Sequence, residues 1–171
     1  MRARTGWSGF GVHGQPGSAV AHEFGVVTES LVPAEGPEVQ GLLLLAMFDP
    51  SPGNVERLID EYRRRSARYL YAYRVDQAVV GVIGLAEPEI GDAEIIHIAV
   101  EEQAQRRGIG RAMIEDVIQR HGLSRLEAET DWGSGYFYRA CGFRVWSIGT
   151  REYAGGEEVE RLRCVWTHTD D

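Results

Sequence analysis

The strongest constraint on this 171-residue chain is a strand-like run that leads directly into a glycine-rich turn and a helix. Residues 94–100 have the sequence EIIHIAV, which suits a strand, and residues 105–110 have the sequence QRRGIG before a helical periodicity begins. The first N–H groups of a helix have no partner inside it and carry partial positive charge. The sequence therefore predicts an anion site at this turn, with an extended group lying along the strand edge.

The residues of the turn strengthen this prediction. Gly108 and Gly110 carry no Cβ, so we expect a phosphate group to approach the backbone closely at both positions. Positive charge gathers beside them at Arg106, Arg107 and Arg111. Two other phosphate motifs are excluded, because a P-loop needs a lysine, which this chain lacks, and the dinucleotide fingerprint needs a glycine where Met113 stands.

A second motif lies downstream, after one expected helix and one expected strand. It combines a polar residue, a small residue, an aromatic pair and a glycine-aromatic pair: Asp131, Ser134, Phe137, Tyr138, Gly142 and Phe143. The first motif, Gln105-x-x-Gly108-x-Gly110, resembles the acyl-CoA signature of the GNAT family of N-acetyltransferases, and the second resembles that family's downstream signature. The resemblance covers roughly residues 25–167.

The resemblance implies the GNAT fold, an α/β (α+β) mixed sheet with antiparallel and parallel strands. In that fold the fourth and fifth strands splay apart, and CoA enters the wedge between them. The element order expected from periodicity agrees with a mixed sheet. Strands are expected near residues 25–31, 69–75, 78–86, 93–101, 126–130, 143–148 and 159–167. Helices are expected near residues 39–47, 54–65, 108–121 and 133–140, with Asn54 as the cap of the second and a loop at residues 87–92. Residues 1–24 are expected to form a flexible leader, and residues 25–171 one N-acetyltransferase domain.

Composition excludes several classes of protein. The net charge of −8 makes nucleic-acid binding a poor hypothesis, because phosphate contacts need clustered positive charge. No apolar run approaches the ~20 residues of a membrane helix, and no secretory signal is visible. Cys141 and Cys164, like the five scattered histidines, match no disulfide or metal-ligand spacing, so we expect a cytoplasmic protein without a metal.

The negative charge suits a cationic acceptor. Acidic residues gather in loops that we expect to border the acceptor side, with solvated loop charge as the alternative explanation: Glu87, Glu89, Asp92, Glu152, Glu157 and Glu158.

Acetyl transfer to an amine needs a base, a hydrogen-bond donor for the tetrahedral intermediate and an acid for the thiolate. The resemblance implies that Tyr138 lies near the CoA sulfur as the acid, the alternative being a packing role. It also implies that Glu94 takes the amine proton through water, the alternative being an exposed strand-end side chain. His97 is a rival base because its free pKa lies near neutrality, but alternation places it opposite Glu94 unless a bulge intervenes.

The resemblance further implies three groups of cofactor contacts. Backbone groups of Ile98, Ala99 and Val100 would pair with the pantetheine arm, as a peptide adds to a sheet edge. The turn would bind the pyrophosphate through Gln105, Arg106, Arg107, Gly108, Ile109, Gly110 and Arg111, although Arg111 could instead be a solvated helix residue. The second motif would add Asp131, Ser134, Phe137 and Tyr138. The family often has Asn at the position of Asp131, and an ionised Asp cannot donate a hydrogen bond.

The sequence therefore predicts an N-acetyltransferase that moves an acetyl group from acetyl-CoA to a primary amine by direct attack. The acceptor would be a small cationic amine or a peptide or protein amine. A non-catalytic acyl-CoA-binding sensor or interaction module is the alternative, and a nucleotide-binding protein is a third hypothesis. No metal, nucleic-acid or membrane partner is expected. Because paired subunits are common in the family, a homodimer is an open alternative to a monomer.

Overall fold

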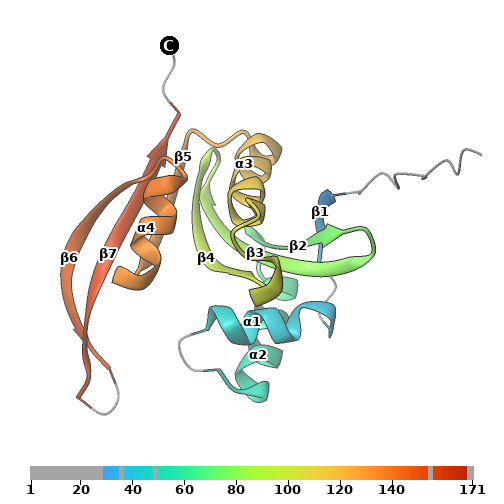
Figure 1. The fold of residues 1–171 in the computed structure, drawn as a ribbon, viewed down its shortest axis with the longest axis horizontal. Coiled ribbons are helices and arrows are strands. Elements are labelled where there is room, and N and C mark those ends of the chain that lie inside the picture. The colour runs from blue at the N-terminus through green and yellow to red at the C-terminus, as the bar shows by residue number, and fades with distance from the viewer. Residues whose placement is uncertain (1–28, 35–36, 48–49, 154–155, 169–171) are drawn as a thin grey trace, which may run out of the picture.

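The computed structural model describes residues 29–34, 37–47, 50–153 and 156–168, and these form a seven-stranded sheet with helices on both faces (Figure 1). The strands are β1 (Glu29–Pro33), β2 (Arg68–Val75), β3 (Ala78–Glu89), β4 (Asp92–Val100), β5 (Arg125–Thr130), β6 (Arg144–Glu152) and β7 (Glu158–Thr167). Their order in the sheet is β1-β2-β3-β4-β5-β7-β6. The α-helices are α1 (Gln40–Ala46), α2 (Pro52–Arg64), α3 (Ile109–His121) and α4 (Trp132–Ala140), and the short 3-10 helices are η1 (Pro37–Val39) and η2 (Glu102–Ala104).

β4 and β5 form a parallel pair within an otherwise antiparallel sheet. Their pairing stops at Ile95 and Ala128. Beyond this point β4 continues to Val100 beside β3, whereas β5 continues to Thr130 beside β7. The two strands therefore splay apart, and one edge of the last β4 residues has no partner among the described strands. The predicted mixed sheet with a splay between strands 4 and 5 is confirmed.

β4 contains one extra residue relative to β3. Leu85 pairs with Ile95 and Gly84 pairs with His97, which leaves Ile96 between them as a β-bulge. A bulge interrupts the strict alternation of side chains along a strand. Residues after Ile96 therefore point to the opposite faces from those that alternation predicts.

The bulge places Glu94 and His97 on the same face of the sheet. Ile95 packs in the cluster beneath α3, so its neighbour Glu94 faces the α2 side. His97 also faces that side, where its ring is hydrogen-bonded to Tyr62 of α2. We expected alternation to separate His97 from Glu94 unless a bulge intervened, and this bulge brings the two side chains to one face.

Local side-chain chemistry sets the helix boundaries. The Ser51 hydroxyl accepts the N–H of Asn54 at 3.2 Å, and Pro52 occupies the first position of α2. Asn54, which we predicted as the cap, lies inside the helix instead. Gly108 and Gly122 bound α3 in the left-handed conformation, at φ +84° and +58°.

The predicted loop at residues 87–92 is instead a tight hairpin. β3 continues to Glu89, β4 begins at Asp92, and these two residues pair across the turn. Gly91 between them has a φ of +86°, a conformation that glycine adopts without strain. The chain therefore reverses within two residues.

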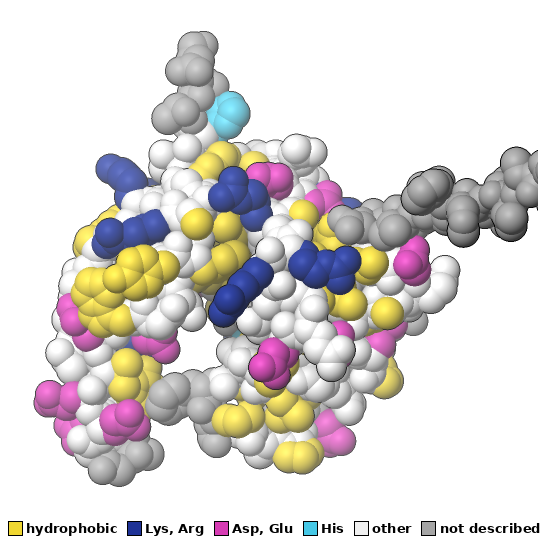
Figure 2. Space-filling view, viewed as in Figure 1, with side chains coloured by type: hydrophobic (Ala, Val, Ile, Leu, Met, Phe, Trp, Pro, Cys, Tyr) yellow, Lys and Arg dark blue, Asp and Glu magenta, His cyan; other side chains and the backbone are white. Residues whose placement is uncertain are grey.

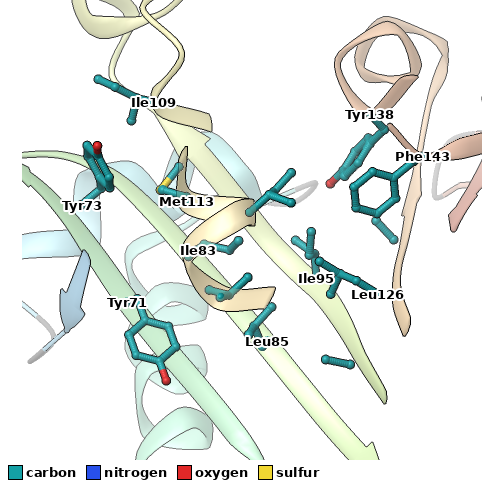
Figure 3. Packing of buried hydrophobic residues seen from close by; sticks show 14 of the residues in the cluster. Tyr71, Tyr73, Ile83, Leu85, Ile95, Ile109, Met113, Leu126, Tyr138 and Phe143 are labelled. Atoms are coloured by element: carbon teal, nitrogen blue, oxygen red, sulfur yellow. The ribbon is translucent and has the colours of Figure 1, made fainter. Parts of the chain in front are cut away.

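Two buried clusters hold the layers together. The cluster beneath α1 and α2 includes Leu43 and Val82. The cluster between the sheet, α3 and α4 includes Met113, Leu126 and Tyr138 (Figure 3). The second cluster spans both sides of the splay, so α3 and α4 stay fixed while the strands diverge.

The predicted leader at residues 1–24 lies outside the described residues, as do the first positions of the strand expected at 25–31. None of the helices in the described part of the chain is long and apolar enough to cross a membrane.

Candidate active site

Two cavities lie on the two sides of the splay and meet there. The α3-side cavity, of about 1260 Å³, lies between β4, α3 and α4. The α2-side cavity, of about 850 Å³, lies between α1, α2, β4, β5 and β7. Leu45, Ile98, Thr130 and Ser134 line both. Figure 2 shows the molecule hollowed between the part built by α4, β6 and β7 and the remainder, with arginine side chains nearby. Two molecules that enter from opposite sides would therefore meet near Ile98.

The α3-side cavity collects most of the predicted cofactor-binding residues: Ile98, Ala99, Val100, Gln105, Arg106, Gly108, Ile109, Gly110, Arg111, Ser134, Phe137 and Tyr138. Arg107 and Asp131 lie outside its lining. The Asp131 carboxylate caps α4, where it accepts the N–H of Ser134 at 3.2 Å. Asp131 therefore orders the helix that carries the aromatic pair, and its predicted contact with the cofactor stays a prediction.

The turn between β4 and α3 has a fixed backbone shape. Arg106 and Gly108 both have positive φ, +59° and +84°. When left-handed and right-handed backbone conformations alternate along a turn, successive N–H groups point toward one side and form an anion-binding concavity. The Gln105 amide donates to the carbonyl of Val100 at 3.0 Å, which ties the turn to the end of β4. A Cβ at Gly108 would meet no atom within 4 Å, so the glycine there serves the backbone conformation.

Gly110 serves packing more than access for a phosphate. A Cβ at this position would lie 2.8 Å from Cε2 of Phe137, so only glycine lets that ring lie against the first turn of α3. Arg111 donates to the carbonyl of Ala140 at the end of α4. The packing of Phe137 on Gly110 and the hydrogen bond from Arg111 both hold α3 against α4. Arg111 also lines the α3-side cavity, so its predicted contact with a phosphate stays a prediction.

Tyr138 is buried at the wall of the α3-side cavity, with 4% of its surface exposed. Its ring packs edge-to-face with Phe137 and Phe143, at centroid distances of 5.1 and 5.3 Å. Burial raises the pKa of Tyr138, so the phenol keeps its proton. Figure 3 shows its hydroxyl pointing away from Phe143, and it has no hydrogen-bond partner in the described part of the chain. Tyr138 is therefore both a packing residue and an available donor.

His97 lies in the wall of the α2-side cavity and is held by Tyr62. The Tyr62 hydroxyl lies 2.9 Å from Nδ1 of His97. Burial raises the pKa of Tyr62, so the phenol stays protonated and forms a neutral hydrogen bond with the imidazole. Burial, together with the charge of Arg68, lowers the pKa of His97 to about 4, so the ring is neutral at physiological pH.

Glu94 belongs to a row of charged side chains on this same face. It lies beside Glu127 on β5, and Arg163 on β7 donates to Glu127 at 3.2 Å and to Glu129 at 2.6 Å. Glu94 is an exposed residue, but partial removal of its carboxyl group from water raises its pKa, and the Glu129 carboxylate raises it further. Glu94 lines neither cavity, so its predicted role as a base stays a prediction.

The acidic loop residues do not border the α2-side cavity as we expected. Glu87, Glu89 and Asp92 lie at the β3–β4 hairpin, at the end of β4 where it still pairs with β5. The other three predicted acidic residues lie at the β6–β7 hairpin, and none of the six lines either cavity: Glu87, Glu89, Asp92, Glu152, Glu157 and Glu158.

Sequence reasoning missed several residues of the site: Arg57, Tyr62, Gly84 and Arg161. Alternation along β7 was the signal that could have placed Arg161 on the same face as Arg163. The other three come together only when α2 packs across the sheet.

The geometry defines a two-sided transfer site. One side offers a free strand edge, a concavity of backbone N–H groups and a protonated phenol. The other side offers charged side chains and a neutral imidazole. This arrangement suits an enzyme that brings two bound molecules together at the splay.

Comparison with known proteins gives the family. Residues 66–145 match the family described as "Acetyltransferase (GNAT) domain". Over 119 residues the chain is 34% identical to the uncharacterized N-acetyltransferase YvbK of Bacillus subtilis, a match that covers 65% of this chain and 70% of YvbK. This chain belongs to the GNAT family of acetyltransferases. The predicted family and N-acetyltransferase class are confirmed.

Solved structures agree with this assignment. A GNAT family acetyltransferase from Elizabethkingia anophelis with acetyl-CoA bound is 26% identical, with a TM-score of 0.62 over 83% of this chain and 98% of that one. The IAA acetyltransferase from Bacillus cereus is 27% identical, with a TM-score of 0.61 over 83% and 99%. The predicted GNAT fold is confirmed.

Proposed function

We propose that this enzyme transfers an acetyl group from acetyl-CoA, held in the α3-side cavity, to an amine held in the α2-side cavity. The meeting of the two cavities at Ile98, where β4 has a free edge, is the observation that carries this proposal. The related Elizabethkingia anophelis structure, which has acetyl-CoA bound, supports the choice of donor.

The residues of the α3-side cavity fit acetyl-CoA. The edge of Ile98–Val100 can pair with the amides of a pantetheine arm. The N–H concavity at Arg106–Gly108 suits a diphosphate, and the Arg106 guanidinium adds positive charge beside it. Bound there, acetyl-CoA supplies an acetyl group already activated as a thioester.

Tyr138 acts as the acid in this proposal. Nitrogen–carbon bond formation breaks the carbon–sulfur bond, and the departing sulfur needs a proton. Tyr138 keeps its proton because of burial, and its hydroxyl is unengaged among the described residues. It is therefore poised to donate to the sulfur.

Glu94 acts as the base through water, and His97 positions the acceptor. With Nδ1 occupied by Tyr62 and a pKa of about 4, His97 is a weak proton acceptor at neutral pH. The pKa of Glu94 is raised, which brings this carboxylate closer to the range of an effective base. In this proposal the Tyr62 hydroxyl donates to Nδ1, and His97 offers its Nε2–H to the acceptor as a hydrogen-bond donor.

Replacement of Tyr138 by Phe tests the function. We expect kcat in a thiol-release assay to fall about 100-fold, while calorimetry shows unchanged CoA affinity. Tyr69→Phe, on β2 and outside both cavities, is the matched control and keeps its rate. Full turnover by Tyr138→Phe contradicts the acid role. Absence of CoA binding and of transfer to any amine by the unmodified enzyme overturns the function itself.

Two further variants separate the candidate bases. Glu94→Gln should lower kcat/KM about 100-fold and remove the acidic limb of the pH profile. His97→Gln should lower kcat/KM less and leave that limb in place. The reverse order of effects would assign the base to His97.

We also propose a cytoplasmic location, because both cysteines are free thiols and Cys164 is buried. Cell fractionation tests this location. The homodimer stays a prediction, and sedimentation tests it.

A further inference from the structure

We propose that the acceptor carries a carboxylate as well as its amine, and that Arg161 and Arg57 bind this carboxylate in the α2-side cavity. The acceptor is then an amino acid and not a polyamine. This inference rests on the proposed acetyl transfer and names the substrate class of the same site.

The carboxylates of the α2-side cavity are already engaged by the protein. Glu129 binds Arg163 at 2.6 Å, and Glu61 binds Arg68 at 3.2 Å. Asp131 caps the first turn of α4. These acids therefore offer little unpaired negative charge to a cationic acceptor.

Two guanidinium groups in the same cavity have no such compensation. The Nε of Arg161 is buried without a hydrogen-bond partner, and Arg161 makes no ion pair with any residue that the structure describes. Arg57 donates to the neutral side-chain oxygen of Asn54, and no described carboxylate pairs with it. Arg161 comes from β7 and Arg57 from α2, so the two cations belong to opposite walls.

Physical chemistry favours an anion between these walls. Arg161 is partly buried and its Nε loses hydration that no described partner replaces, whereas Arg57 is exposed and adds positive charge from the other wall. A bound carboxylate replaces the lost hydration, because the planar guanidinium binds a carboxylate through two parallel hydrogen bonds. An acceptor whose amine lies near Ile98 and whose carboxylate faces the arginines satisfies both ends of the cavity.

Matched acceptors test this inference. The thiol-release assay compares each common L-amino acid, β-alanine and 4-aminobutyrate with the amide of the same compound, and includes spermidine. We expect the best carboxylated acceptor to exceed its amide in kcat/KM by about 10- to 100-fold. Arg161→Gln should remove most of this difference, because it lowers kcat/KM for the carboxylated acceptor far more than for its amide. Arg161→Lys should restore part of it, because a charge remains.

Arg63→Gln is the matched surface control, since Arg63 lies on α2 with an exposed ion pair to Asp60 and lines neither cavity. Calorimetry supplies a readout without turnover. The preferred amino acid should bind the CoA-loaded wild-type protein, and Arg161→Gln should lose that binding while its thermal melting stays cooperative.

The outcomes separate this inference from the function on which it rests. If the enzyme prefers spermidine or the amides, or if Arg161→Gln slows carboxylated and amide acceptors equally, the carboxylate inference is overturned and acetyl transfer stands. A strong preference for acidic peptides over free amino acids likewise overturns the choice of a small acceptor. If no amine is acetylated and CoA does not bind, the proposed function fails first.

Discussion

The hydroxyl of Tyr62 lies 2.9 Å from Nδ1 of His97, and this contact joins α2 to the bulged segment of β4. Gly84 on β3 makes the contact feasible, because a Cβ there would overlap the Tyr62 hydroxyl. The orientation of a cavity-lining imidazole therefore depends on a glycine that lines no cavity.

Replacement of Gly84 by Ala should displace Tyr62 and release His97. Forced overpacking of this kind costs about 2 kcal/mol, which urea unfolding measures. Gly41→Ala in α1 is the control, because no atom lies within 4 Å of its added Cβ and alanine favours a helix. Equal stability of Gly84→Ala and wild type would show that Tyr62 is not confined as described.

His97 should make the fold less stable in mild acid. Burial lowers its pKa from 6.5 to about 4, so between these values the unfolded chain binds more protons than the folded one. The contribution of neutral His97 to the free energy of unfolding is fully present above pH 6.5. It decreases by up to about 3 kcal/mol as the pH falls toward 4. Urea unfolding between pH 7 and 4.5 should show a smaller loss for His97→Gln than for wild type. Parallel curves for the two proteins would contradict the lowered pKa.

Gly110 and Phe137 should behave as a coupled pair. Gly110→Ala pushes a methyl group against the Phe137 ring, and we expect a loss of about 1–3 kcal/mol together with weaker CoA binding. Phe137→Leu in the same chain should recover part of both losses, so the double mutant should be less impaired than the sum of the single mutants. Strict additivity in unfolding and calorimetry would count against the packing role of Gly110.

His121 should stabilise the fold without affecting catalysis. Its Nε2 lies 2.8 Å from the Tyr71 hydroxyl and its Nδ1 lies 3.1 Å from the Glu87 carboxylate, so one ring links α3, β2 and β3. His121→Ala leaves both partners unsatisfied, and we expect a loss of about 2–3 kcal/mol. Tyr71→Phe removes one hydrogen bond and should cost about 1 kcal/mol. Because none of these side chains lines a cavity, kcat/KM should stay near the wild-type value for the folded protein. A large loss of kcat/KM in folded His121→Ala would contradict this separation.

The sequence predicted the features that depend on local patterns. The turn at Gln105–Gly110, the capping glycine Gly122 and the aromatic pair of α4 each follow from residues that lie within one or two turns of each other. Local patterns predict such features correctly because turn conformation and helix ends depend mainly on residues nearby in the chain.

Features that depend on distant contacts could not be predicted. Tyr62 and His97 are 35 residues apart in the chain, and Gly110 meets Phe137 only after α3 and α4 dock. The bond from Arg111 to the carbonyl of Ala140 illustrates the same limit, since it forms only when α3 and α4 dock. The Ile96 bulge depends on the pairing of β3 with β4, which no single strand reveals.

That bulge constrains how the enzyme can change. Since one additional residue reverses the direction of all side chains that follow it, a deletion within the second half of β4 would exchange the groups that face donor and acceptor. A point substitution in β4 can therefore change one cavity alone, whereas a change in the length of this strand alters both cavities together.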